Sequence, residues 1–214
     1  MATKLEEKFV KDKIKGEDVF EFGCSPGKFT AEIAKDHTVT AIDLYDAEVT
    51  DGYSFIKGDI LETDIDGTFD SVVCLSSFEH CGIESLNYLP GNEEDLLTLQ
   101  PIADKLTSLI KVGGKLVITA PFGDTNIYYV DKDGNNGTIE EVTDPAWGFR
   151  TFRLEDLQDI FKDLHLETSK VYKYVEGDYF EESSWKQEDE KEYKLYSNEH
   201  RALICCVFAR LGKV

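Results

Sequence analysis

Short apolar stretches alternate along this chain with segments whose apolar residues recur every three or four positions. The apolar stretches have the length of strands, and each ends at glycine or polar residues. The periodicity between them predicts helices. The expected strands cover residues 18–22, 38–42, 53–57, 69–75, 115–120, 166–175 and 201–211, and the expected helices cover 26–35, 93–110 and 154–164.

This order of elements predicts an α/β fold, a Rossmann-like, seven-stranded, mostly parallel sheet with helices on both faces. The connection before the last strand is long, and we expect that strand to run antiparallel. The length of 214 residues suits a single domain over 1–214. Residues 1–15 are expected to form an amphipathic helix with Leu5, Phe9, Val10 and Ile14 on one face.

A glycine-containing turn lies between the first strand and the following helix, in residues 19–30. Gly23 and Gly27 let a ligand approach the backbone closely. Ser25 suits a helix N-cap and is followed by proline, so we expect N–H groups at a helix N-terminus here. Glu21 precedes the turn; it would repel a pyrophosphate but could pair with a ligand ammonium group. This carboxylate disfavours a nicotinamide-dinucleotide site.

Acidic and polar residues also follow the next strands. Asp43 comes about 20 residues after the glycine turn, where a carboxylate can bind ribose hydroxyls. Asp59 follows the third strand, and residues 76–80 follow the fourth. Ligands of open α/β sheets bind at the carboxyl ends of the strands, so these residues are expected to share one site. Each aspartate alone would also suit an ordinary turn.

The motif Glu21-x-Gly23-x-Ser25-x-Gly27 resembles the first motif of class I S-adenosylmethionine-dependent methyltransferases of the type 11-like group, with Ser25 in place of the central glycine. The resemblance extends over residues 19–211 and includes the fifth-strand segment 113–118. It implies that S-adenosylmethionine is the cofactor, with Glu21 at the methionine ammonium, Asp43 at the ribose and Asp59 at the adenine. Cofactor-binding residues implied by it are Glu21, Phe22, Gly23, Cys24, Ser25, Gly27, Asp43, Leu44, Asp59, Ile60, Ser76 and Ser77.

His80 is the candidate general base, because an imidazole titrates near neutral pH and an alcohol acceptor must lose its proton. Glu79 is a second candidate catalytic residue. The pair resembles a Glu-His signature of small-molecule methyltransferases, in many of which the histidine packs on the cofactor instead. Some relatives carry Glu-x-x-Glu-His and bind a metal; here Ser76 replaces the first glutamate, and we expect no metal.

Residues 74–83, Tyr88, Gly91 and Trp185 resemble a subgroup of bacterial glycan-cluster methyltransferases. This similarity implies a small-molecule acceptor, with O-methylation of a sugar or nucleotide-sugar hydroxyl. Segments 121–150 and 176–192 are expected to be loop insertions near the acceptor, and Tyr128, Tyr129, Trp147 and Arg150 are candidates for its pocket. An N-methyltransferase of a small amine and a non-catalytic module that binds S-adenosylmethionine or S-adenosylhomocysteine remain alternatives.

The formal net charge of −20 argues against a nucleic-acid partner and against an anionic membrane surface. No apolar run approaches the roughly 20 residues that cross a bilayer. The five cysteines show no metal-ligand or CxxC spacing, which favours a reducing, cytoplasmic location. The sequence leaves both a monomer and a homodimer open.

Overall fold

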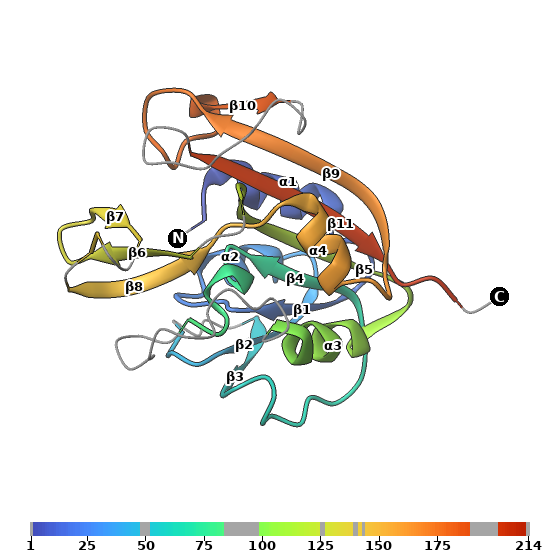
Figure 1. The fold of residues 1–214 in the computed structure, drawn as a ribbon. Coiled ribbons are helices and arrows are strands. Elements are labelled where there is room, and N and C mark those ends of the chain that lie inside the picture. The colour runs from blue at the N-terminus through green and yellow to red at the C-terminus, as the bar shows by residue number, and fades with distance from the viewer. Residues whose placement is uncertain are drawn as a thin grey trace.

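A computed structural model describes residues 2–47, 52–83, 99–124, 127–138, 141–142, 144–188 and 201–212. Its main sheet has the strand order β10-β9-β11-β5-β4-β1-β2-β3 (Figure 1). Strands β1 to β5 pair in parallel, and β11 pairs antiparallel with both β5 and β9. The strands are β1 (Asp18–Phe22), β2 (Thr38–Asp43), β3 (Tyr53–Lys57), β4 (Phe69–Leu75), β5 (Ile110–Pro121), β9 (His165–Tyr174), β10 (Trp185–Glu188) and β11 (Ala202–Ala209).

The predicted α/β architecture and the antiparallel last strand are confirmed. An eighth strand, β10, extends the expected seven, and it lies in the acidic segment predicted to be a loop. It pairs antiparallel with β9 at the edge of the sheet. Trp185 holds it there, because the indole packs against Leu5 and Leu203 and its Nε1–H donates to the Tyr179 carbonyl over 2.9 Å.

Helices cover both faces of the sheet. On one face, α1 (Lys4–Lys13) and α2 (Lys28–Ile33) bury residues such as Phe9 and Phe29 against β1, β2, β4, β5 and β11. On the other face, α3 (Gln100–Ser108) and α4 (Leu154–Ile160) cover the larger core cluster. Adjacent residues of one strand serve opposite faces, as Cys205 and Cys206 do, because side chains alternate along a strand. None of the described helices is long and apolar enough to cross a membrane.

The observed helix boundaries differ from the predicted ones: α2 covers Lys28–Ile33 where 26–35 was predicted, and α4 covers Leu154–Ile160 where 154–164 was predicted. Helix α3 begins at Gln100 with Pro101 in its first turn, while residues 93–98 lie outside the described part of the chain. Gly113 and Gly114, which lie between the predicted helix 93–110 and the predicted strand 115–120, belong to β5. Gly113 adopts φ +84, and its N–H donates to the Arg210 carbonyl. The two glycines therefore allow β5 to bend at this point, and they do not end a helix.

Segment 121–150, also predicted to be a loop, contains a second, three-stranded sheet. Its strands are β6 (Ile127–Asp131), β7 (Asn136–Gly137) and β8 (Pro145–Arg150), in the order β7-β6-β8. In Figure 1 this small sheet projects to the left of the main sheet. Strand β8 contacts the short helix η1 (Phe78–His80) that follows β4, which brings the small sheet to the carboxyl edge of the main one.

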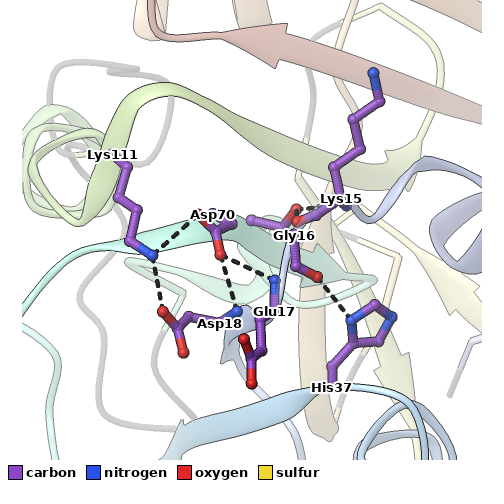
Figure 2. Close-up of polar contacts among 8 residues, drawn as sticks. Lys15, Gly16, Glu17, Asp18, His37, Asp70 and Lys111 are labelled. Carbon is purple, nitrogen blue, oxygen red and sulfur yellow. Dashed lines mark hydrogen bonds and ion pairs between the residues drawn. The ribbon is translucent and has the colours of Figure 1, made fainter.

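The amino-terminal ends of β1 and β4 are joined by the polar network that Figure 2 shows. The Asp70 carboxylate accepts the N–H groups of Glu17 and Asp18, each over 3.0 Å. Lys111 pairs with Asp70 at 3.0 Å and with Asp18 at 2.7 Å. Gly16 adopts φ +79, and a Cβ there would lie 2.2 Å from the Asp70 Cβ. This network fixes the start of β1, at the end of the sheet opposite the predicted ligand site.

Replacing Asp70 with alanine is expected to lower the free energy of unfolding by about 2 kcal/mol, because two backbone N–H groups lose a charged acceptor. The hydrogen bonds and Lys111 lower the pKa of Asp70 in the folded state. The stabilisation is therefore complete above the unfolded-state pKa and is lost as the pH falls through the lower folded-state pKa. Urea unfolding between pH 7 and pH 3 checks this. The exposed Asp66→Ala variant is the control; equal stability of the two variants at pH 7 would contradict the assignment.

Candidate functional site

The carboxyl ends of β4, β1, β2 and β3 lie side by side in that order, and they carry the residues singled out in the sequence. Glu21 and the glycine turn end β1, Asp43 ends β2, Asp59 follows β3, and Ser76 follows β4. The fold thus brings all four strand ends to one edge of the sheet, as expected for a ligand site of an open α/β fold.

The glycine turn packs directly against the turn after β4. Gly23 has φ +76, and its N–H donates to the Ile42 carbonyl over 2.9 Å. A Cβ on Gly23 would lie 2.3 Å from the Ser77 Cβ. The Ser77 hydroxyl in turn donates to the Phe22 carbonyl over 2.7 Å. Glycine is required here by both the backbone conformation and the close approach of the two turns.

The expectation that Ser25 caps the following helix is wrong. The N-cap of α2 is Gly27, in the left-handed conformation at φ +90, and no side chain caps the helix. The Ser25 N–H donates to Asp43 Oδ2 over 2.8 Å, and the Tyr45 N–H donates to Asp43 Oδ1 over 2.9 Å. The carboxylate of Asp43 therefore ties the glycine turn to the end of β2, a link between strands that the local sequence pattern does not contain.

Glu21 is buried, with 2% of its surface exposed. Its Oε2 and the buried Thr30 Oγ1 of α2 both lack a hydrogen-bond partner among the described residues. Burial raises the pKa of Glu21 to about 7, and the charge of Asp43 adds to the rise. A buried carboxylate oxygen without a partner costs free energy unless a ligand satisfies it. The site therefore fits a ligand ammonium group, and Thr30 is a neighbour that the motif did not reveal.

The remaining cofactor candidates occupy contrasting positions. Cys24 and Ile60 are buried, and Ile60 belongs to the larger core cluster. Leu44 is 61% exposed beside Asp43. Asp59 Oδ1 accepts the Leu61 N–H over 2.8 Å, so its carboxylate shapes the turn after β3.

Ser76 connects the end of β4 with the N-terminal helix. It adopts φ +45, which is uncommon for a residue other than glycine. Its N–H donates to Thr119 of β5, and its hydroxyl donates to Oε1 of Glu6 over 2.5 Å. Glu6 did not emerge as a site residue from the sequence, because the helix was interpreted only by its apolar face. The spacing Thr3-x-x-Glu6, a capping box, is the signal that marks it.

Glu79 is a second buried carboxylate at this edge, with 3% of its surface exposed. Its Oε2 has no hydrogen-bond partner among the described residues. Burial raises the pKa of Glu79 to about 8, and the charge of Glu6 adds to the rise. Among the residues that the structure describes, no group of three or more histidine, cysteine or acidic side chains has a metal-binding arrangement.

One ring nitrogen of His80 is held by the backbone of the small sheet, and the other is available. Its Nδ1–H donates to the Gly148 carbonyl of β8 over 2.7 Å, which leaves the lone pair on Nε2. Burial of the ring lowers the pKa of His80. Nε2 lies 3.9 Å from Oε1 of Glu79, and 41% of the His80 side chain is exposed. His80 can therefore accept a proton from a group that reaches this edge.

The small sheet supplies an aromatic surface next to His80. Trp147 meets the His80 ring edge-on with centroids 5.8 Å apart, and Phe149 lies between Trp147 and Tyr128. Trp147 is 48% exposed. The other two predicted pocket residues, Tyr129 and Arg150, are buried, and Arg150 donates to the Cys81 carbonyl over 3.4 Å.

Comparisons with known proteins agree with this fold. Residues 1–117 match the family described as FtsJ-like methyltransferase. A methyltransferase structure from Methanosarcina mazei has a TM-score of 0.64 at 12% identity, and the match covers 95% of this chain and 97% of that one. The 1,6-didemethyltoxoflavin-N1-methyltransferase of Burkholderia thailandensis, with S-adenosylhomocysteine bound, has a TM-score of 0.60 at 13% identity, covering 97% and 77%. The sugar N-methyltransferase KedS8 of a Streptoalloteichus species has a TM-score of 0.55 at 12% identity, covering 97% and 85%. Among curated proteins, no sequence matches this chain.

Proposed function

This chain belongs to the FtsJ-like methyltransferase family, and from that premise we propose that it methylates a hydroxyl group of a small polar acceptor, such as a sugar or nucleotide sugar. S-Adenosylmethionine is the methyl donor. The observation that carries the proposal is that the buried carboxyl group of Glu79, whose Oε2 has no hydrogen-bond partner among the described residues, lies beside the half-exposed imidazole of His80. A cytoplasmic location, and a monomeric or homodimeric state, are inferred from the sequence.

Glu21 is proposed to bind the methionine ammonium, because its buried Oε2 needs a donor. Asp43 is proposed to bind the ribose hydroxyls, since a carboxylate that ends β2 is placed as in other ribose sites. Asp59 and Ile60 are proposed to hold the adenine, with Leu44 over the ribose side. The remaining proposed contacts come from the turns after β1 and β4, namely Phe22, Gly23, Cys24, Ser25, Gly27, Ser76 and Ser77.

The bound cofactor supplies an electrophilic methyl group on a sulfonium, so the protein must chiefly hold an acceptor in line and remove a proton. We assign the proton to Nε2 of His80. The Gly148 carbonyl fixes the ring so that Nε2 carries the lone pair, and the lowered pKa keeps the imidazole neutral at pH 7. The carboxylate of Glu79, 3.9 Å away, faces the positive charge that the ring gains.

The exposed face of Trp147 suits a sugar ring, because aromatic side chains combine a large apolar surface with an electron-rich face. A sugar ring stacked on Trp147 would lie near His80, because the centroids of the two side-chain rings are 5.8 Å apart. KedS8, a sugar N-methyltransferase by its description, shares the fold, so this likeness bears on a sugar acceptor and not on methylation at oxygen. Trp185, part of the glycan-cluster resemblance, packs far along the sheet beside α1, while Tyr88 and Gly91 lie outside the described residues.

Calorimetric titration with S-adenosylmethionine tests the cofactor site. Glu21→Ala and Asp43→Ala are each expected to weaken binding by about 10- to 100-fold, because each removes a charge-assisted hydrogen bond. With a pKa of about 7 for Glu21, wild-type affinity should rise about tenfold between pH 6 and pH 8, since only the carboxylate pairs with an ammonium. Glu17→Ala, an exposed charge at the opposite end of β1, is the control. Unchanged affinity in both site variants would overturn the assignment.

A further inference from the structure

Glu6, Ser76 and Glu79, here called the acidic pocket, bring two buried carboxylates to the end of β4. Glu6 comes from α1 and Glu79 from η1, so the pocket joins elements that are far apart in the sequence. Glu6 is 1% exposed and Glu79 is 3% exposed. The inference drawn from this pocket rests on the proposed cofactor site.

The capping box holds Glu6 in the pocket. Oε2 of Glu6 accepts both the backbone N–H and the hydroxyl of Thr3, over 2.8 and 2.9 Å. Oε1 accepts the Ser76 hydroxyl. All three contacts donate to the carboxylate, so Glu6 acts purely as an acceptor. Helix α1 packs on β4, β5 and β11, and its first turn lies near the carboxyl end of β4.

Neither Glu6 nor Glu79 forms an ion pair with a lysine or arginine of the described residues, although the charge of the N-terminal ammonium lowers the pKa of Glu79. The lysine and arginine ion pairs of the described chain involve other acids, and only His80 lies within 4 Å of Glu79, at 3.9 Å. The thiols of Cys74 and Cys81 also face Glu79, and burial raises the pKa of both, so they stay uncharged. A buried carboxyl group without a hydrogen-bond partner costs free energy, and it costs more once it is ionised. Oε2 of Glu79 also has no hydrogen-bond partner among the described residues. The missing hydrogen bond and the missing lysine or arginine partner together point to a cation on a ligand.

The strand order indicates which cation this is. Adenine, ribose and methionine are assigned to the ends of β3, β2 and β1, and β4 is the next strand along the edge. Glu6 contacts Ser76 at that strand end, and Glu79 lies in the short helix that follows it. We propose that Glu6 and Glu79 form an electrostatic subsite for the sulfonium of S-adenosylmethionine, which makes the protein favour the charged donor over the neutral product, S-adenosylhomocysteine.

Binding of S-adenosylmethionine is expected to release a proton from Glu79. At pH 7 the pKa of about 8 leaves Glu79 mainly protonated in the free protein. Arrival of a sulfonium favours the carboxylate, so the Glu79 proton passes to the buffer. S-Adenosylhomocysteine carries no charge on sulfur and should not release this proton. Titrations at pH 7 in phosphate and in Tris, whose ionisation enthalpies differ, measure the difference between the two ligands.

The decisive experiment compares the dissociation constants of S-adenosylmethionine and S-adenosylhomocysteine by calorimetry. The preference for the donor is the dissociation constant of S-adenosylhomocysteine divided by that of S-adenosylmethionine. In Glu6→Gln and in Glu79→Gln this ratio is expected to fall on the order of tenfold, mostly because the donor binds more weakly. Glu7→Gln, which removes one charge from the same turn of α1, should leave the preference unchanged. Glu21→Gln should weaken both ligands equally, because both carry the ammonium.

The outcomes separate this inference from the proposed function. An unchanged preference in both pocket variants, with Glu21→Gln still weakening both ligands, would overturn the sulfonium subsite alone. Failure of the wild-type protein to bind either ligand would overturn both proposals. Because Glu6→Gln also alters the cap of α1, its thermal midpoint is measured beside that of Glu79→Gln, which leaves the cap intact. Loss of preference in Glu79→Gln at an unchanged midpoint supports an electrostatic role.

Discussion

The His80→Gln variant is expected to lose about 10²- to 10⁴-fold in kcat, the usual contribution of a general base, while its affinity for S-adenosylmethionine stays within about twofold. Glutamine can still donate to the Gly148 carbonyl, which His80 does over 2.7 Å, but it offers no basic nitrogen to the acceptor. The measurement is the rate of S-adenosylhomocysteine formation with an acceptor identified from a set of sugars, nucleotide sugars and small amines, beside calorimetry of the cofactor.

The pH profile provides an independent test of the same residue. Because the pKa of His80 lies below its usual 6.5, wild-type kcat should be constant at neutral pH and fall as the pH drops through that lower value. The fall should vanish in His80→Gln. His165→Gln, at the exposed start of β9, is the control. If His80→Gln kept more than about a tenth of the wild-type kcat, the histidine would serve mainly to pack the site.

The acceptor class follows from how the variant responds to pH. A hydroxyl keeps its proton throughout the accessible range, so His80→Gln should remain slow up to pH 9. An amine loses its proton in solution as the pH rises, and its methylation by the variant should then recover. Recovery at high pH would favour the N-methyltransferase alternative and overturn the proposed hydroxyl acceptor.

The parallel core of the sheet could be predicted from the sequence because its strands are nearly continuous apolar runs. Residues 69–75, for example, supply Val73 to one face and Cys74 to the other, and both are fully buried. A strand covered on both sides needs apolar side chains at every position, which makes it visible without any partner. The positions of Glu21, Asp43 and Asp59 at strand ends followed from the same pattern.

The contacts between distant elements could not be predicted in this way. Glu6 meets Ser76 across 70 positions of the chain, and His80 meets Gly148 across 68. Strand β10 was not predicted, because Trp185 is the only apolar residue among its four. Strands β6 and β8 have strand-like aromatic residues, but the asparagine, aspartate and glycine turns between them favoured a loop interpretation. The sequence around Ser25 fits a helix N-cap, but its side chain caps no helix, and its backbone N–H donates to Asp43.

The Gly23→Ala variant is expected to lose about 3 kcal/mol of unfolding free energy, together with most of its affinity for S-adenosylmethionine. Two costs combine at this position. The left-handed conformation at φ +76 disfavours any Cβ, and the new methyl group would lie 2.3 Å from the Ser77 Cβ. The turns after β1 and β4 must then separate, which breaks the bond from the Ser77 hydroxyl to the Phe22 carbonyl. Urea unfolding and calorimetry of the cofactor measure the two effects.

Two further variants separate the conformational cost from the steric one. Gly134→Ala has nearly the same torsion, φ +85, but nothing within 4 Å of the new Cβ, so it should lose only about 1 kcal/mol and leave cofactor affinity unchanged. Gly23→Ala combined with Ser77→Gly removes the clashing Cβ and should recover part of the stability beyond the sum of the single changes. If Gly23→Ala were no more costly than Gly134→Ala, the close contact between the two turns would not be what requires glycine. The cofactor site would then tolerate a wider separation of β1 and β4 than the structure shows.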